Sequence, residues 1–353
     1  MSRHWGIFLL LLFLPGWSGA ETVYRGEQSL WQDTVWNGDI LIDGILTIPA
    51  GVSLEIRPGT RVRFTRFDSN GDGIGENEIF IQGVLKAEGT AESPILFTSA
   101  EAHPVPGDWG AVNMMAAEEE NLFSHCRVEY AYRGFHSHFS DAVVSHCEFV
   151  RNVRGMQFQE ATVTITDTQL RDNFNGIQFR DSRVVLKNFA IRDNHWGLRC
   201  VYSEVTVEDG EVTGNLINGI NLRDSTLDGS GLRVAGNRKG IYLQGSKGTL
   251  RDSELFDNSE HGILLEKSNA VVSNNRISGN GRAGILWRDS TGSLRDNRLA
   301  GNGEYALVNE GAGTVDARGN AWGSLDPAAI TGLIRDGADR PGVGAVNAAD
   351  PQP

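Results

Sequence analysis

The chain has 353 residues, of which 40% are hydrophobic, and its 32 Lys and Arg against 45 Asp and Glu give a formal net charge of −13. This hydrophobic fraction is enough for a sizeable core and too low for an integral membrane protein. The acidic balance disfavours binding of nucleic acid or anionic lipid through net charge, so only a local basic patch could bind a polyanion.

Residues 1–20 are typical of a secretory signal. Arg3 precedes an apolar run from Ile7 to Leu14, and the small residues Ser18 and Ala20 come just before Glu21. We expect cleavage after Ala20 and a secreted or periplasmic protein. No second apolar run of membrane length follows, so membrane insertion is not expected.

Residues 21–112 show strand-like alternation, as in Ile40-Leu41-Ile42, but without the regular spacing seen further along the chain. We interpret them as irregular first coils that cap a repeat array. Within this part, residues 68–76 match the first half of a calcium loop. Asp68, Asn70 and Asp72 stand at positions 1, 3 and 5, a glycine stands at position 6, and Glu76 stands at position 9.

Position 12 of this loop is Ile79, so the usual bidentate glutamate is missing, and Glu78 is the neighbour that could replace it. The pattern predicts either a structural Ca²⁺ site or a polar loop without metal. Neither interpretation makes the loop catalytic.

Residues 113–325 carry a repeat of 21–22 residues. Its glycines are Gly134, Gly155, Gly176, Gly197, Gly219, Gly240, Gly262 and Gly284. An asparagine series keeps the same step: Asn152, Asn173, Asn194, Asn215, Asn237, Asn258, Asn280 and Asn302. So does a serine series: Ser182, Ser203, Ser225, Ser246, Ser268 and Ser290. Apolar residues alternate in short runs between these positions, which indicates about three short strands per unit. Such a unit cannot close a core alone, so the units must stack, with each strand pairing in parallel with its equivalent.

These columns resemble the right-handed parallel β-helix of the pectin-lyase-like superfamily, with its Asn ladders. The resemblance implies an all-β, right-handed parallel β-helix solenoid with coils of 21–22 residues over 113–325. It does not choose a function, because this scaffold hosts lyases, hydrolases, epimerases, adhesins and inert spacers.

The segments Ser124-His125-Cys126 and Ser145-His146-Cys147 are one repeat apart, so each residue is expected to stack on its equivalent, His125 on His146 and Cys126 on Cys147. A disulfide, two reduced core thiols and a metal site all stay open for this pair. Cys200 aligns with apolar residues of neighbouring repeats and is expected in the core.

Two outward-facing columns of the repeat are rich in amides, Arg and His, with no carboxylate before Glu266. The candidate binding residues are His136, His138, Gln157, Gln159, Gln178, Arg180, Arg199, Asn221, Arg223 and Tyr242. Planar amides and guanidinium groups suit hydroxyl and carboxylate partners. The columns therefore predict a carbohydrate-binding strip for an acidic glycan, with an ordinary solvated sheet face as the alternative.

Aspartates recur just before the ladder positions, and their regular spacing indicates turn chemistry rather than catalysis. They are Asp172, Asp193 and Asp257 before Asn, and Asp181, Asp224 and Asp289 before Ser. The catalytic residues are unknown. If there are any, the candidates are His136 and His138 with Arg180 or Asp141, at the start of the strip.

At the C-terminus, residues 326–353 read as a cap and tail. Asp326-Pro327 is a helix start, which predicts a short capping helix over about 327–335, and an extended tail follows Gly337.

Taken together, the sequence favours a non-catalytic protein that binds a polysaccharide or cell-surface glycan. The alternatives are a polysaccharide lyase, glycoside hydrolase or epimerase, and a purely structural or assembly protein.

Overall fold

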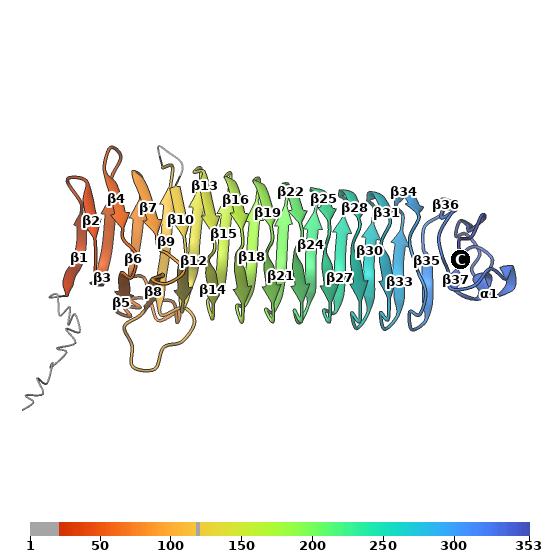
Figure 1. Cartoon of the computed structure of the whole chain (residues 1–353), viewed down its shortest axis with the longest axis horizontal. Coiled ribbons are helices and arrows are strands. Elements are labelled where there is room, and N and C mark those ends of the chain that lie inside the picture. Colours follow the sequence, from red (N-terminus) through yellow and green to blue (C-terminus); the bar gives the residue numbers. More distant parts are fainter. Residues whose placement is uncertain (1–20, 118–120) are drawn as a thin grey trace, which may run out of the picture.

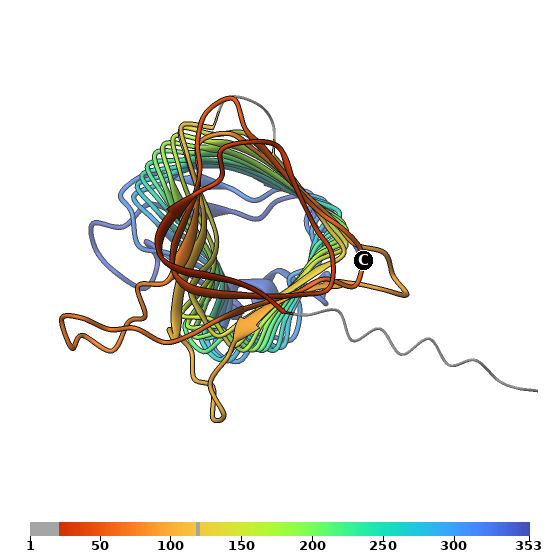
Figure 2. The same ribbon diagram turned by 90° about the vertical axis from the view of Figure 1, so that its left-hand side faces the viewer.

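The computed structural model describes residues 21–117 and 121–353, so the predicted signal sequence lies outside the described residues. The described chain is a parallel β-solenoid of about 13 turns with one short helix near its C-terminus (Figure 1). Seen along the axis, the regular coils superpose into one tube, and loops of the N-terminal coils, coloured orange, project from it (Figure 2).

Most coils contribute one strand to each of three parallel stacks. The first stack contains β3 (Asp39–Ile48), β6 (Glu78–Ile81), β9 (Trp109–Met115), β12 (Ala131–His138), β15 (Arg154–Gln159), β18 (Asn175–Arg180), β21 (Trp196–Val201), β24 (Asn218–Arg223), β27 (Lys239–Gln244), β30 (His261–Glu266), β33 (Ala283–Arg288) and β35 (Tyr305–Asn309). The second contains β2 (Thr34–Trp36), β4 (Ser53–Ile56), β7 (Val84–Glu88), β10 (Asn121–Ser124), β13 (Ala142–Ser145), β16 (Thr162–Thr166), β19 (Arg183–Lys187), β22 (Glu204–Glu208), β25 (Thr226–Ser230), β28 (Lys247–Arg251), β31 (Asn269–Ser273) and β34 (Thr291–Arg295). The third contains β5 (Arg61–Phe64), β8 (Ile95–Ser99), β11 (Cys126–Glu129), β14 (Glu148–Val150), β17 (Gln169–Arg171), β20 (Ala190–Arg192), β23 (Glu211–Thr213), β26 (Arg233–Ala235), β29 (Glu254–Phe256) and β32 (Arg276–Ser278).

Parallel pairing keeps like residues in register. Ile177 pairs with Leu198, for example, and Ile220 with Ile241, and these side chains are at most 1% exposed. Alternate residues of each strand therefore point into one continuous core, and the others face outward. In the N-terminal coils the same pairing joins Leu46 of β3 to Ile79 of β6, although residues 65–77 are inserted as a loop between β5 and β6.

The predicted asparagine ladder is present. In each coil the side-chain amide of a ladder Asn donates to the Oδ1 of the Asn one coil further on, at 3.0 Å from Asn173 to Asn194, and to a backbone carbonyl of the preceding coil. The serines form a second ladder, in which Ser182 N–H donates to Ser203 Oγ at 3.2 Å. Both columns satisfy buried polar groups at the corners of the coil.

The residue with a left-handed backbone conformation is the one that precedes the ladder Asn, not the Asn itself. All six recurring aspartates have φ between 46° and 57°, as the turn interpretation predicts. The ladder glycines are needed for close approach instead: a Cβ on Gly176 would lie 2.8 Å from the Gly197 carbonyl oxygen.

The three cysteines are free thiols in the core, so of the three interpretations of Cys126 and Cys147 the structure has the reduced pair. Both belong to a third corner ladder, in which Cys126 N–H donates to Cys147 Sγ at 3.4 Å and Cys147 N–H donates to Thr168 Oγ1 at 3.2 Å. The adjacent His125 and His146 stack at the surface, with ring centroids 4.5 Å apart. Cys200 is buried, as predicted.

The remaining elements close the two ends. At the N-terminus β1 (Thr22–Ser29) pairs with β3, and at the C-terminus lie β36 (Val315–Asp316), α1 (Pro327–Gly332), β37 (Ile334–Arg335) and β38 (Val346–Asn347). Asp326 caps α1 as predicted, but the helix ends at Gly332, and the tail folds back rather than extending away. It pairs β38 with β36, and Gln352 N–H donates to Asn320 O at 3.0 Å. The tail thus satisfies backbone groups of the last coil.

Candidate functional site

Strand pairing places the two predicted columns on one outward face of the first stack. His136, Gln157, Gln178, Arg199, Asn221 and Tyr242 follow one another in register, and so do His138, Gln159 and Arg180. Val201, Arg223 and Gln244 continue the second column toward Glu266. The spacing of the sequence therefore predicts this face correctly.

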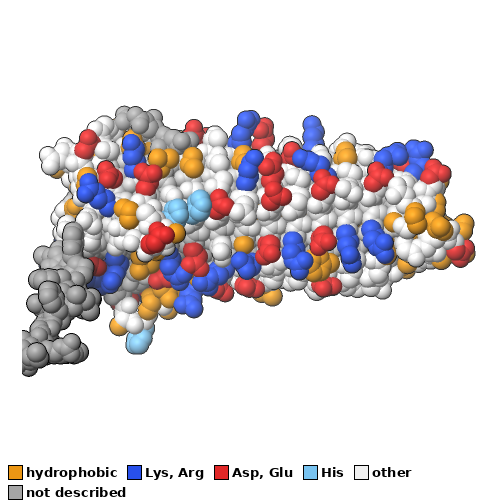
Figure 3. All heavy atoms as spheres, in the orientation of Figure 1, with side chains coloured by type: hydrophobic (Ala, Val, Ile, Leu, Met, Phe, Trp, Pro, Cys, Tyr) orange, Lys and Arg blue, Asp and Glu red, His pale blue; other side chains and the backbone are white. Residues whose placement is uncertain are grey.

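A groove of about 350 Å³ runs along these columns from Gln157 to Gln244. Five basic residues line it: Arg180, Arg199, Arg223, Arg238 and Lys239. Among the described residues, none that lines the groove is an Asp or Glu. On the face drawn in Figure 3, Lys and Arg side chains are interspersed with Asp and Glu side chains. The groove is therefore a local basic surface on an acidic chain.

A third column, which we missed in the sequence, runs beside the first, and three of its members, Trp196, Asn218 and Lys239, line the groove. Its members stand immediately before the ladder glycines: Arg133, Arg154, Asn175, Trp196, Asn218 and Lys239. On two rungs this column reaches the first column, because the Asn175 amide donates to Gln178 Oε1 at 3.2 Å and the Asn218 amide donates to Asn221 Oδ1 at 3.3 Å. The same repeat of 21–22 residues would have revealed it.

The three columns contain most of the buried polar atoms that have no hydrogen-bond partner within the described chain. There are eight such atoms, and five lie here: Arg133 Nε, His138 Nε2, Arg154 Nε, Asn175 Oδ1 and Asn218 Oδ1. Unpaired buried polar atoms are rare in folded proteins. Of these five residues, Asn218 lines the groove.

Arg199 lies at the centre of the groove. Burial and the nearby cations of Arg154 and Arg223 lower the pKa of its guanidinium. The group lies over the Trp196 ring, 5.0 Å from the centroid. Arg180 and Arg223 are paired with Asp181 and Asp224 at 2.8 and 3.8 Å, whereas Arg199 forms no ion pair within the described residues. Its positive charge is the least neutralised in the groove.

Two family models match the chain: a pectate-lyase-like β-helix domain over residues 29–188 and a right-handed β-helix region over residues 227–321. The chain is a pectin-lyase-like β-helix protein. The sequence-based resemblance and the predicted fold class are thereby confirmed.

Among solved structures, this β-helix protein is similar to a mutant of the periplasmic alginate epimerase AlgG, with 15% identity over 76% of this chain and 72% of that one and a TM-score of 0.44. It is similar to the A-module of mannuronan C-5 epimerase AlgE4 from Azotobacter vinelandii, with 15% identity, 79% and 86% coverage and a TM-score of 0.43. It is also similar to a mutant tailspike protein of E. coli bacteriophage HK620, with 9% identity over 91% of this chain and 72% of that one and a TM-score of 0.36. Similarity at this level transfers no activity.

No curated protein sequence matches significantly. In the part of the β-helix protein that the structure describes, no helix has the length and apolar character needed to cross a membrane.

His136 belongs to the first column but is only 5% exposed and does not line the groove. This corrects its assignment as an accessible binding residue. Its Nδ1 lies 2.8 Å from Asn113 Oδ1, and the Asn113 amide donates to Glu78 Oε1 at 3.2 Å. Burial, with the charges of Arg133, His138 and Arg154, lowers the pKa of His136 to about 3, and burial raises the pKa of Glu78.

The catalytic candidates do not converge. His138 and Arg180 are separated in their column by Gln159, and the Asp141 carboxylate accepts a hydrogen bond from Thr162 N–H at 3.1 Å.

The buried, neutral His136 predicts acid sensitivity. Unfolding returns its pKa from about 3 toward 6.5, so the unfolded chain binds an extra proton below pH 6.5 and stability falls as the pH is lowered. Between pH 7 and pH 4 we expect this residue alone to cost about 3 kcal/mol of unfolding free energy. Urea unfolding at both pH values should show that His136→Gln loses less unfolding free energy between pH 7 and pH 4 than the unmodified protein does. His103→Gln, on an exposed loop, should behave like the unmodified protein; an unchanged pH dependence in His136→Gln would contradict the prediction.

The 68–76 loop departs from the predicted calcium arrangement. Glu78 lies on β6 and its carboxylate faces Asn113, so it does not complete the loop. Asp68 accepts hydrogen bonds from Gly71 N–H and Gly73 N–H at 2.8 and 2.9 Å. The Arg66 guanidinium lies 4.0 Å from the Asp68 carboxylate. Within the described chain, no three His, Cys, Asp or Glu side chains form a group that could hold a metal ion.

Proposed function

We propose that the β-helix protein binds an acidic polysaccharide in this groove, with the polymer lying along the solenoid axis, and does not cleave it. The observation that carries the proposal is a groove lining with five basic residues and, among the described residues, no carboxylate, on a chain with a net charge of −13. Four of the five are paired with acids beside the groove, so the unpaired guanidinium of Arg199 supplies the attraction. A ligand that gains from this surface must itself carry negative charge.

The repeat favours a polymer over a small anion. Equivalent side chains recur at the strand spacing of about 4.8 Å, so each rung offers similar groups to successive units of a linear chain. The amides of Gln157, Gln178 and Asn221 suit sugar hydroxyls, whereas the guanidinium fork of Arg199 suits a uronate carboxylate. Trp196 adds an aromatic surface beside them.

The environment of the nearby acids supports binding without catalysis. Asp181 and Asp224 stand in left-handed turns and are paired with Arg180 and Arg223, and His136 is buried. General acid or base catalysis requires such a group within hydrogen-bond reach of the substrate. Secretion or export to the periplasm, which the signal-like residues 1–20 predict, would bring the protein to periplasmic or extracellular polysaccharides.

Isothermal titration with oligogalacturonate and with uncharged dextran tests the proposal, followed by assays for unsaturated uronates and new reducing ends. Binding of the uronate alone, without product, supports it. Product would replace it by a lyase or hydrolase function. A single-stranded oligonucleotide that binds equally well would indicate a general polyanion site, and no binding at all would favour a structural or assembly role.

Calcium binding by Asp68, Asn70, Asp72 and Glu76 stays a prediction. A site with a Kd of about 0.1–1 mM, as in extracellular modules, would add roughly 1–2 kcal/mol of stability at 5 mM Ca²⁺. We therefore expect thermal melting to shift upward by a few degrees relative to EGTA, and the shift to disappear in Asp68→Asn. Equal melting temperatures with Ca²⁺ and EGTA would mean that the Arg66 contact replaces the metal.

A further inference from the structure

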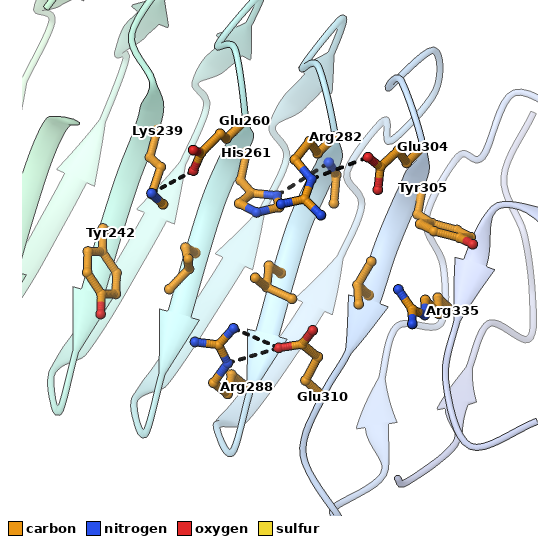
Figure 4. A pocket seen from close by; sticks show the side chains of 14 residues that line it. Lys239, Tyr242, Glu260, His261, Arg282, Arg288, Glu304, Tyr305, Glu310 and Arg335 are labelled. Atoms are coloured by element: carbon orange, nitrogen blue, oxygen red, sulfur yellow. Dashed lines mark hydrogen bonds and ion pairs between the residues drawn. The ribbon is translucent and has the colours of Figure 1, made fainter. Parts of the chain in front are cut away.

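A second hollow, of about 360 Å³, continues the groove toward the C-terminus (Figure 4). Lys239 and Tyr242 line both, so a linear ligand that leaves one can enter the other. We call this hollow the C-terminal pocket; it lies over β27, β30, β33 and β35.

The floor of the C-terminal pocket is apolar although it lies on the outside of the solenoid. Leu264, Leu286 and Val308 continue the column of Tyr242 in register. With Ala283 they form a cluster separate from the main core, flanked by Tyr242 and Tyr305, and their exposed fractions are 1–6%. A hollow with an apolar floor and a few polar groups around it is the usual form of a small-ligand site.

The walls of the pocket carry charges that are already neutralised. Lys239 is paired with Glu260 at 2.6 Å, and Arg282 with Glu304 at 3.3 Å. On the opposite side Arg288 is paired with Glu310 at 2.8 Å. Figure 4 shows these pairs above and below the aliphatic floor. The exception is Arg335, which also lines the pocket, forms no ion pair within the described residues and lies over the Tyr305 ring, 6.0 Å from its centroid.

We propose that the C-terminal pocket binds sugar units that carry acetyl groups. The acetyl methyl would pack on Leu264, Leu286 and Val308, and the hydroxyl and carbonyl groups would bond with the paired charges of the walls, which retain hydrogen-bonding capacity. This inference rests on the proposed function, since it assigns the pocket to the same polymer that lies in the groove. That polymer is then acidic at one end of the site and acetylated at the other.

Two hexasaccharides with the same β-1,4-glucan backbone test this inference by titration: chitohexaose, which has an acetamido group on each unit, and cellohexaose, which has none. We expect chitohexaose to bind at least about fourfold more tightly, because burying one methyl group contributes roughly 0.8 kcal/mol, or about fourfold. Leu286→Asn and the near-isosteric Val308→Thr should remove most of this preference. Val271→Thr, an exposed position of β31 in the second stack, is the matched control.

The outcomes separate this inference from the proposed function. Equal binding of both hexasaccharides, absence of binding by either, or a preference that persists in both floor variants would overturn it. Oligogalacturonate binding that Arg199→Ala weakens would meanwhile leave the proposed function intact. Conversely, a chitohexaose preference that depends on Leu286 and Val308 in a protein that does not bind oligogalacturonate would support the pocket and reject the acidic groove.

Discussion

Replacing Arg199 by Ala is expected to weaken oligogalacturonate binding about 10- to 100-fold. A hydrogen bond to a charged group contributes roughly 1.5–3 kcal/mol, which corresponds to this range of affinity. Arg199 should have the largest effect in the groove, because it lies at its centre and no carboxylate of the described chain neutralises it. Arg180 and Arg223 are paired with Asp181 and Asp224, so each would have to exchange a partner to bind the ligand.

Titration calorimetry of both proteins measures the effect, and Arg192→Ala provides the control. Arg192 ends β20 in the third stack, away from the groove, and is partly buried like Arg199. Affinity should fall with added salt in the unmodified protein, and less steeply in Arg199→Ala, because one fewer charge contact is screened. If both arginine variants bind like the unmodified protein, the groove is not the binding site.

The face that carries the groove was predictable because a solenoid turns sequence spacing into spatial alignment. Once the step of 21–22 residues is known, residues such as Gln157, Gln178 and Arg199 must stack, whatever their chemistry. The third column follows the same rule. The sequence analysis did not identify it because its members are chemically mixed, from Arg154 to Trp196.

The first rung of the strip was harder to predict. His136 follows the step, but its rung pairs with β9 through an irregular register between Arg133 and Phe135. Its burial depends on Asn113 and Glu78, which belong to coils without the regular repeat. Burial of this kind depends on contacts between coils of different length, which the spacing does not contain. The contact of Arg66 with the 68–76 loop is unpredictable for the same reason.

Cys126 and Cys147 show a different limit of sequence analysis. Their spacing correctly predicts stacking, and stacking at the strand repeat is compatible with a disulfide. The structure shows that the positions belong to a corner ladder, where a side chain accepts a backbone N–H from the neighbouring coil. Thr168, Ser253 and Asn275 have this role in later coils. Because these residue types differ, the column was not visible as a repeated letter.

Replacing Asn194 by Ala is expected to cause the largest loss of stability, about 4 kcal/mol of unfolding free energy. The Asn194 amide donates to Leu170 O at 3.1 Å and to Asn215 Oδ1 at 3.0 Å, and its Oδ1 accepts from the backbone and side chain of Asn173, both at 3.0 Å. The residue is 2% exposed, so water cannot replace these bonds. Each buried group left unpaired costs roughly 1–3 kcal/mol.

Urea unfolding followed by circular dichroism measures this loss, with Asn269→Ala as the control. Asn269 begins β31 and is exposed, so its replacement should change stability by less than about 0.5 kcal/mol. Because each coil contacts only its neighbours, Asn194→Ala should also increase amide hydrogen exchange most in the coils that contain Asn173 and Asn215. Equal stability of the two variants, or exchange that rises evenly along the solenoid, would show that the ladder does not hold neighbouring coils together.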